Sequence, residues 1–312
     1  MDFIRGFHNL KPKHQGCVAT LGNLDGLHLG HQALLAQLKT KAHELQLPST
    51  VITFEPLPRE YFAHLKNEPM PSRLTRLRDK VTLLEDNGVD RLLCLHFNRT
   101  LRSFAADIFV RRVLVEGLQV RYLVIGDDFR FGCDRKGDFA LLKSMGQQYG
   151  FEVVHLPTLQ HRDERVSSSR IRDLLSMNEI DHANELLGRE YSISGRIIRG
   201  NQLGRQLGVP TANINIGHYT LPLAGVYAVE VDGLGKRRQG VANMGTRPTV
   251  SGDKKPVLEV NIFDFDDDIY DQTIKIIFRK NIRREQKFES LDILREQIKN
   301  DVISAKQFFK HQ

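Results

Sequence analysis

The first 160 residues alternate between short apolar runs rich in β-branched residues and longer segments in which apolar residues recur with helical periodicity. The apolar runs lie at 17–21, 50–54, 91–95, 122–125 and 151–155, and the helical segments at about 29–46, 73–87, 103–116 and 138–149. Some of them contain continuous apolar stretches, such as 92–95 and 122–125, which are typical of strands in a sheet that helices cover on both faces. Strand and helix in regular alternation predict a doubly wound α/β sheet with right-handed crossovers.

The second part of the chain has a different pattern. After a helical stretch at about 169–187, short strand candidates at 191–198, 226–231, 239–243, 257–263 and 274–278 are separated by Gly, Pro and Asp turns. This pattern predicts an antiparallel β-barrel, closed by a final amphipathic helix at about 291–309. Because a domain usually has about 100 to 200 residues, we predict two domains, 1–186 and 187–312.

The net charge indicates which kinds of partner the chain can bind, and the cysteine content indicates its cellular compartment. The net charge of +7 and the pI of about 9.3 indicate anionic partners, which include nucleic acid, anionic membranes and phosphorylated metabolites. The longest basic run is only 236–238, so the charge is dispersed and does not resemble a nucleic-acid tail or a membrane-binding cluster. We predict a cytoplasmic protein for three reasons. The three cysteines lie far apart in the sequence, no apolar stretch is long enough to span a bilayer, and the segment 1–14 is polar where a signal peptide needs an apolar core.

The loops that follow strands of a doubly wound sheet are where its ligands bind. The first of them, 20–31, ends the first predicted strand and opens the first predicted helix, and it contains three glycines. Glycines permit close approach of the backbone, and N–H groups at a helix start favour a phosphate. His28 and His31 stand three residues apart, so one helical turn presents both imidazoles on one face. Together they would stabilise charge on a transferred phosphate and its leaving group, which predicts nucleotide binding.

This loop resembles the His-x-Gly-His signature of the nucleotidyltransferase superfamily, which includes class I aminoacyl-tRNA synthetases. Three later segments, 53–58, 126–132 and 167–172, resemble the remaining signatures of the bacterial FAD synthetase module and occur in the same order. The sequence departs from the family at Leu24, where Phe is usual, and at Ser169, where Thr is more common. The resemblance implies a Rossmann-like nucleotidyltransferase domain that adenylylates FMN.

The resemblance implies that His28, His31 and Arg172 are catalytic. The implied nucleotide- and flavin-binding residues of this domain are Gly22, Asp25, Gly26, Gly30, Glu55, Pro56, Asp128, Phe129, Ser167 and Ser168. The side-chain chemistry agrees with these roles. The serines can cap a helix, and Arg172 can hold triphosphate oxygens in a bidentate fork. Asp128 can accept hydrogen bonds from a flavin ring while an aromatic face such as that of Phe129 stacks on it.

The segment 195–213 contains a second group of candidate site residues. Gly200, Gly204 and Gly208 lie in a loop whose backbone amides can surround phosphates. Thr211 and Asn213 offer a hydroxyl and an amide oxygen to a hard cation, so we predict them as metal ligands. The segment lacks the Gly-Lys-Ser/Thr end of a Walker P-loop. It resembles the Gly-rich and Pro-Thr-Ala-Asn segment of riboflavin kinases, which implies that Arg205 and Pro210 also bind nucleotide.

The run 257–265 alternates, with Leu258, Val260 and Ile262 on one face and Glu259 and Asn261 on the other. A lone Glu on a strand is usually a solvated residue. The resemblance to riboflavin kinases, however, implies that Glu259 is the general base, with an Asn at 261 where His is more common. It also implies flavin-side loops, whose predicted binding residues are Asn243, Arg247, Arg283 and Glu285.

Taken over 16–301, the chain resembles the bifunctional bacterial riboflavin kinase and FAD synthetase. The resemblance implies that the barrel phosphorylates riboflavin to FMN with ATP and that the α/β domain transfers AMP to FMN, giving FAD and pyrophosphate. It implies Mg²⁺ with ATP in both steps, and riboflavin, FMN and ATP as small-molecule partners, without nucleic acid or membrane. No obligate protein partner is evident in the sequence, and self-association and the relative rates of the two steps stay open.

Two other functions fit part of the pattern. A nucleotidyltransferase or synthetase-like enzyme acting on another substrate, including tRNA, fits the 20–31 loop, but the Lys-Met-Ser-Lys-Ser type loop of class I synthetases is absent. A nucleic-acid-binding protein fits a small barrel and a basic pI. The barrel motifs contain Gly, Thr, Asn and Glu instead of the basic and aromatic residues that line a single-strand groove, which argues against it.

Overall fold

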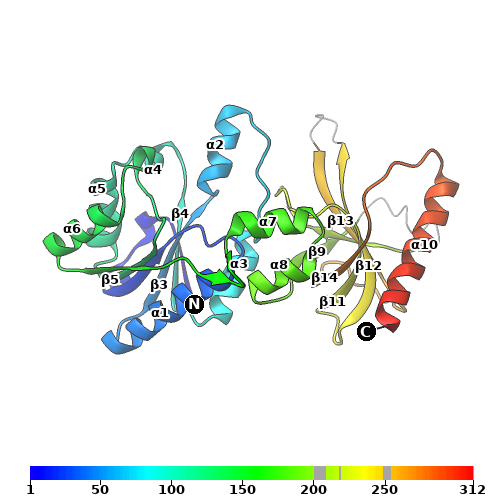
Figure 1. Cartoon of the computed structure of the whole chain (residues 1–312), viewed down its shortest axis with the longest axis horizontal. Coiled ribbons are helices and arrows are strands. Elements are labelled where there is room, and N and C mark those ends of the chain that lie inside the picture. Colours follow the sequence, from blue (N-terminus) through cyan, green and yellow to red (C-terminus); the bar gives the residue numbers. More distant parts are fainter. Residues whose placement is uncertain (200–208, 218, 249–253, 312) are drawn as a thin grey trace. The chain divides into compact units, whose positions relative to one another are not determined.

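The computed structural model describes residues 1–199, 209–217, 219–248 and 254–311 (Figure 1). The chain forms two compact units. The first comprises Met1–Pro71 and Thr75–Ser168, and the second comprises Ser72–Leu74 and Ser169–Gln312. The first unit contains a six-stranded sheet and the second a closed barrel. The predicted fold class, an α/β domain followed by an antiparallel barrel, is confirmed.

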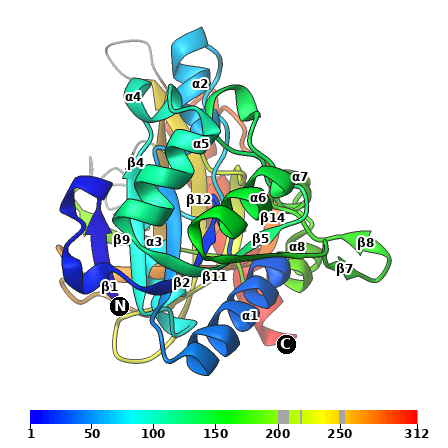
Figure 2. The ribbon, with the colours of Figure 1, turned by 90° about the vertical axis from the view of Figure 1, so that its left-hand side faces the viewer.

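All pairs in the six-stranded sheet of the first unit are parallel (Figure 2). Its strands are β1 (Asp2–Arg5), β2 (Cys17–Leu21), β3 (Ser49–Glu55), β4 (Arg91–His96), β5 (Val120–Gly126) and β6 (Glu152–Leu156). They lie in the order β1-β4-β3-β2-β5-β6, so the strand order reverses between β2 and β5. The loops after β2 and β5 therefore flank the switch point, where doubly wound sheets bind their ligands.

Helices cover both faces of this sheet. They are α1 (Leu29–Leu45), α3 (Leu77–Asp86), α4 (Arg99–Arg102), α5 (Ala106–Phe109), α6 (Phe139–Tyr149) and the wider π-type helix η3 (Val110–Gly117). The helix α2 (Pro58–Lys66) follows β3. Successive residues of β2 face opposite ways, so Val18 packs with α1 and α3 while Ala19 packs with α5, η3 and α6. Both faces of the strand are thus buried, which explains the continuous apolar runs in the sequence.

The first unit departs from the sequence prediction in a few elements. The edge strand β1 was not predicted, because it has four residues of which only Ile4 is buried. The predicted helix at 73–87 begins only at Leu77, because Ser72–Leu74 belong to the second unit. There the backbone N–H of Arg73 donates to the carbonyl oxygen of Thr220 at 2.9 Å. The short helices α2 and α4 were also not predicted.

The second unit is a barrel in which every strand pair is antiparallel. Its strands are β9 (Ser192–Ile198), β10 (Ala212–Asn215), β11 (Gly225–Asp232), β12 (Arg238–Pro248), β13 (Lys254–Ile262) and β14 (Thr273–Arg283). They close in the order β10-β13-β12-β11-β14-β9, with β10 also paired to β9. Only β10 was missing from the predicted strands.

Three helices accompany the barrel. The long helix α10 (Leu291–Lys310) packs Ala305 and Val302 against an apolar cluster that includes Val226 and Val241, as the predicted amphipathic helix requires. The helix α7 (Ser168–Ser176) precedes α8 (Ile180–Leu187), which packs against β14. None of the described helices combines the length and apolar character needed to cross a membrane.

Candidate active sites

The loop between β2 and α1 has an unusual backbone. Leu24 and Leu27 have φ values of 42° and 43°, and Gly26 between them has a φ of 90°. A left-handed conformation is costly for leucine, and it persists only where the surroundings enforce it. Both leucines are buried in the apolar core between the sheet and α1, so core packing holds the loop in its tight turns. The side chain of Leu24, which stands where the family usually has Phe, thus anchors the loop.

His28 and His31 come together at the start of α1, as predicted. Their rings are stacked, with centroids 3.7 Å apart and an interplanar angle of 21°. His28 is the N-cap residue and is buried, and His31 lies within the first turn of the 17-residue helix. A Cβ atom on Gly30 would lie 3.3 Å from the His28 ring, so glycine leaves the ring its space. The helix start adds its positive dipole end to this imidazole pair, which suits a phosphate group.

Asp25 was predicted to bind nucleotide, and the structure shows its carboxylate committed to holding the loop. Oδ1 accepts from the backbone N–H of Thr75 at 3.1 Å, and Oδ2 accepts from the Arg59 guanidinium at 3.0 Å. The hydroxyl oxygen of Thr75 in turn accepts from the N–H of Gly26 at 3.0 Å. Arg59 and Thr75 were not singled out in the sequence, where they lie 34 and 50 residues from Asp25 and carry no local signal.

Ser168 of the fourth signature contacts the first one. Its hydroxyl donates to the carbonyl oxygen of Asp25 at 2.8 Å, and both residues belong to the first unit. Ser167, one residue earlier, is half-buried. Further along α7, Arg172 donates to the hydroxyl of Ser169 at 3.1 Å. The predicted roles of these residues toward phosphate stay predictions.

The remaining predicted residues of this unit lie at the end of β3 and after β5. Glu55 is the last residue of β3 and Pro56 follows it, both half-buried. After β5, the carboxylate of Asp128 is exposed and forms an ion pair with Arg165, which the sequence analysis did not single out. Phe129 stacks on the buried ring of Phe131 at a centroid distance of 5.7 Å, and is itself only half-buried.

Asp127 supports the same loop. Its carboxylate accepts from the hydroxyl and the backbone N–H of Thr158. The hydrogen bond from the Thr158 hydroxyl lowers the pKa of the Asp127 carboxyl below its ordinary value, because it stabilises the charged form. The loop that presents Asp128 and Phe129 is therefore tied to the segment that follows β6.

In the barrel, the strand register places three predicted residues in one row. Glu259 on β13 is directly opposite Asn213 on β10 and, on its other side, Asn243 on β12. Directly opposed residues of antiparallel strands project to the same face of the sheet. Leu258 and Val260 are fully buried while Glu259 is half-buried, so the predicted alternation is confirmed. The row carries carboxylate and amide oxygens, and it lies on the outer face of the barrel.

Asn261 fixes the segment that leads into this row. Its Nδ2 donates to the carbonyl oxygen of Pro210 at 2.7 Å. Thr211 follows Pro210 directly and precedes the first residue of β10. The amide at 261, where the family more often has His, thus holds the chain on which Thr211 and Asn213 lie.

We expect Asn261→Leu to lower kcat/KM for riboflavin phosphorylation about tenfold, because a hydrogen bond that orders the 210–213 segment is lost. Asn261→His is the matched control, since an imidazole N–H can donate to the same carbonyl and should keep the rate within about threefold. Initial rates of FMN formation measure both variants. Equal rates for Asn261→Leu and the unchanged protein would contradict this role.

Two of the predicted flavin-side residues have defined contacts. Arg283 forms a bidentate ion pair with Asp301 of α10, with both N···O distances at 2.8 Å, so much of its guanidinium is held by the helix. The Glu285 carboxylate lies against Gly245, where a Cβ atom would come within 2.5 Å of its Oε1. Arg247 lies on β12, opposite Lys255. Gly200, Gly204, Arg205 and Gly208 lie outside the described residues.

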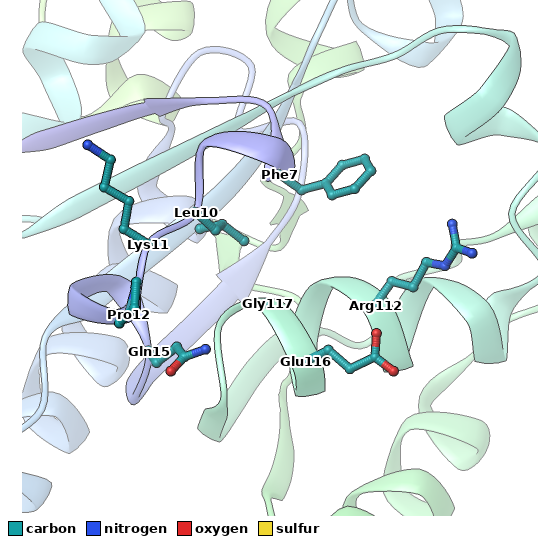
Figure 3. Close-up of a pocket in the computed structure, with 8 residues that line it drawn as sticks. All are labelled: Phe7, Leu10, Lys11, Pro12, Gln15, Arg112, Glu116 and Gly117. Carbon is teal, nitrogen blue, oxygen red and sulfur yellow. The ribbon is translucent and has the colours of Figure 1, made fainter.

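Two further features concern ligand binding. Among the described residues, no three or more His, Cys, Asp and Glu side chains gather as they would to hold a metal ion. A cavity of about 410 Å³ lies in the first unit, between the segment after β1 and the helix η3 (Figure 3). It is lined by Phe7, Leu10, Lys11, Pro12, Gln15, Arg112, Glu116 and Gly117. None of these residues belongs to a predicted motif.

The fold and the two sites define a two-domain transferase, with a nucleotidyltransferase-type sheet and a separate barrel that carries a row of oxygen donors. A family model described as FAD synthetase matches residues 10–170, and one described as riboflavin kinase matches residues 187–309. The chain belongs to the family of bifunctional riboflavin kinases and FMN adenylyltransferases.

Individual relatives are similar to this chain along nearly its full length. The chain is 49% identical to a bifunctional riboflavin kinase/FMN adenylyltransferase of Pseudomonas fluorescens, over 98% of this chain and 97% of the relative. It is 46% identical to the protein of the same description from Escherichia coli K12, over 99% and 98%. A crystal structure described as a macrolide-efflux protein from Streptococcus pneumoniae has the same fold, with a TM-score of 0.78 and 30% identity over 96% of this chain and 97% of that one.

Proposed function

We propose that the chain converts riboflavin to FAD in two ATP-dependent steps, one on each unit. The observation that carries the proposal is that each fold presents its own set of reactive groups. The sheet places the stacked His28–His31 pair at a helix start, and the barrel places Glu259 in a row with two asparagines. Full-length similarity to bifunctional relatives supports both activities in one chain.

In the first step, the barrel phosphorylates riboflavin. The primary hydroxyl oxygen of the ribityl chain attacks the γ-phosphorus of ATP, and the bond from that phosphorus to the bridging oxygen of ADP breaks. Glu259 orients the hydroxyl and accepts its proton. Because the transition state is loose, positioning of the hydroxyl matters more than the basicity of the carboxylate.

The donor set beside Glu259 fits Mg²⁺. Thr211 and Asn213 offer oxygen ligands, which hard cations prefer, and Mg²⁺ commonly uses few protein ligands together with substrate phosphates. We propose that these two residues hold the ion that accompanies ATP, where it would screen the charge of the polyphosphate. The predicted glycine loop with Arg205 and Pro210 would bind the nucleotide itself.

In the second step, the α/β unit adenylylates FMN. A phosphate oxygen of FMN attacks the α-phosphorus of ATP, and the bond to the pyrophosphate oxygen breaks, so no covalent enzyme intermediate is required. His28 and His31 donate to the oxygens that gain charge at the α-phosphate and the leaving group, and the resemblance of the 167–172 signature assigns the same role to Arg172. Asp128 and Phe129 are the proposed contacts to the flavin ring, and Ser167 and Ser168 belong to the phosphate site.

We also propose that the functional boundary lies at 186/187, that the enzyme is cytoplasmic, and that it acts without nucleic acid or an obligate protein partner. The start of the riboflavin kinase family match at residue 187 supports the boundary. The helices α7 and α8 nevertheless pack with the second unit, where the Tyr227 hydroxyl donates to Asn178 at 2.6 Å. A kinase fragment should therefore retain these helices for stability.

The test is incubation of the full chain with riboflavin, ATP and Mg²⁺, followed by chromatographic separation of the flavins. FMN and then FAD should accumulate, with release of one pyrophosphate for each FAD. Excess EDTA should stop both steps, and restored Mg²⁺ should recover them, because the polyphosphate charge is no longer screened without the ion. FMN formation that persists in EDTA would contradict the proposed metal requirement, and absence of both flavins would contradict the function.

A further inference from the structure

Lys80 lies on α3 and its side chain is fully buried. A buried ammonium group is uncommon, because removal of its charge from water is costly unless fixed partners compensate. The side chain reaches the carboxyl ends of two neighbouring strands. Its Nζ donates to the carbonyl oxygen of Asn23 at 2.6 Å and to the hydroxyl of Thr53 at 3.3 Å. The ammonium therefore contacts the loop that carries the histidine pair.

Both hydrogen-bond partners of Lys80 lie close in sequence to residues of the predicted nucleotide site. Asn23 is the second residue after β2, and His28 follows it five positions later. Thr53 lies in β3, two residues before Glu55, and is fully buried. An ammonium has three donors and no acceptor, so one group can bind a carbonyl and a hydroxyl at the same time. A charged donor also makes stronger hydrogen bonds than a neutral one.

The same region of the chain holds the loop at a second point. Thr75, five residues before Lys80, binds the carboxylate of Asp25 through its N–H and the N–H of Gly26 through its hydroxyl. The segment 75–80 thus fixes Asn23, Asp25 and Gly26, which are consecutive apart from Leu24. Leu24 is itself anchored in the core with a left-handed backbone. These contacts hold the loop that leads into α1, where His28 and His31 lie.

We propose that Lys80 is a positioning residue for adenylyl transfer. It touches neither reacting atoms nor nucleotide, and it acts by fixing the main chain of Asn23 so that His28 and His31 face the α-phosphate in the transition state. This inference rests on the proposed role of the α/β unit in FAD formation. Small displacements of catalytic groups reduce rates far more than they reduce substrate binding. We therefore expect loss of the Lys80 ammonium to lower kcat and to leave KM nearly unchanged.

The test is the full-length Lys80→Met variant, which keeps an unbranched side chain of similar length but removes the donors. With FMN and ATP as substrates, we expect kcat for FAD formation to fall about 100-fold while KM for ATP stays within about threefold. Riboflavin phosphorylation by the same molecules should be unchanged, which reports that the chain is folded. Lys41→Met is the matched control, since Lys41 on α1 pairs with Glu44 and lies over the ring of Tyr122 instead of holding the loop after β2, and it should leave both rates unchanged.

Two conservative variants keep the proposal falsifiable if Lys80→Met does not fold. Thr53→Val removes one acceptor at constant shape and should lower kcat for FAD formation about tenfold, with KM for ATP unchanged. Lys80→Arg retains a charged donor and should recover at least a tenth of the kcat that the unchanged protein shows. A normal kcat in Lys80→Met or Thr53→Val overturns the proposal, and so does a loss seen only in KM. Failure of the unchanged protein to make FAD from FMN would instead overturn the proposed function.

Discussion

Glu259→Gln should abolish FMN formation from riboflavin, with a fall in kcat of about 1000-fold, within the range that a general base contributes. The amide keeps the shape of the side chain but lacks the negative charge that orients the ribityl hydroxyl and accepts its proton. Its neighbours Asn213 and Asn243 on the flanking strands should keep the row intact. The measurement is a riboflavin kinase assay with separation of flavins, followed by the same variant supplied with FMN.

The second assay is the internal control. Given FMN and ATP, Glu259→Gln should form FAD at the rate of the unchanged protein, because the reaction takes place on the other unit. Glu230→Gln is the matched substitution in the same barrel, at a glutamate that pairs with Arg279 and Arg237, and it should leave the kinase rate within about twofold. A Glu259→Gln enzyme that still phosphorylates riboflavin normally would remove Glu259 from the mechanism.

His28→Ala should give the opposite pattern, in which riboflavin is converted to FMN and the reaction stops there. We expect kcat for FAD formation to fall by about 100- to 1000-fold, the usual effect of removing one preorganised donor from a developing charge. His31 should not compensate, because its ring is stacked on the ring of His28, and loss of one ring also frees the other to move. FAD and pyrophosphate release from FMN and ATP are the quantities to measure.

His43→Ala is the control for this substitution, since His43 is exposed in the last turn of the same helix α1. It should leave both activities unchanged. If His28→Ala and Glu259→Gln lost the same activity, the assignment of one reaction to each unit would be wrong. If His28→Ala still formed FAD at a normal rate, the stacked histidines would have no part in adenylyl transfer.

The parallel sheet was predictable because its strands are buried on both faces. A strand such as β2, whose five residues are all buried, shows a short and nearly continuous apolar run, and its length distinguishes it from a buried helix. The barrel strands were recognised for a different reason, since Leu258, Val260 and Ile262 alternate with polar residues. The strands β1 and β10 were missed because each has only four residues and one buried side chain, which leaves no period to detect.

The proximity of candidate site residues was predictable where these residues are close together in sequence. His28 and His31 lie within one helical turn, so their proximity follows from local geometry. The groups that hold the loop in place gave no such signal. Lys80 reads as one more polar residue on an amphipathic helix, and its burial becomes apparent only when α3 packs beside β2 and β3.

The two folds, their order and the segments predicted to carry the chemistry follow from the amino-acid sequence, because they depend on short-range periodicity and on local motifs. The tertiary structure alone decided which residues support those segments. It paired Asp25 with Arg59, tied Ser168 to the first loop, and set Glu259 in register with Asn213 and Asn243. Such contacts join residues tens of positions apart, and they form only when strands and helices have packed into the folded units.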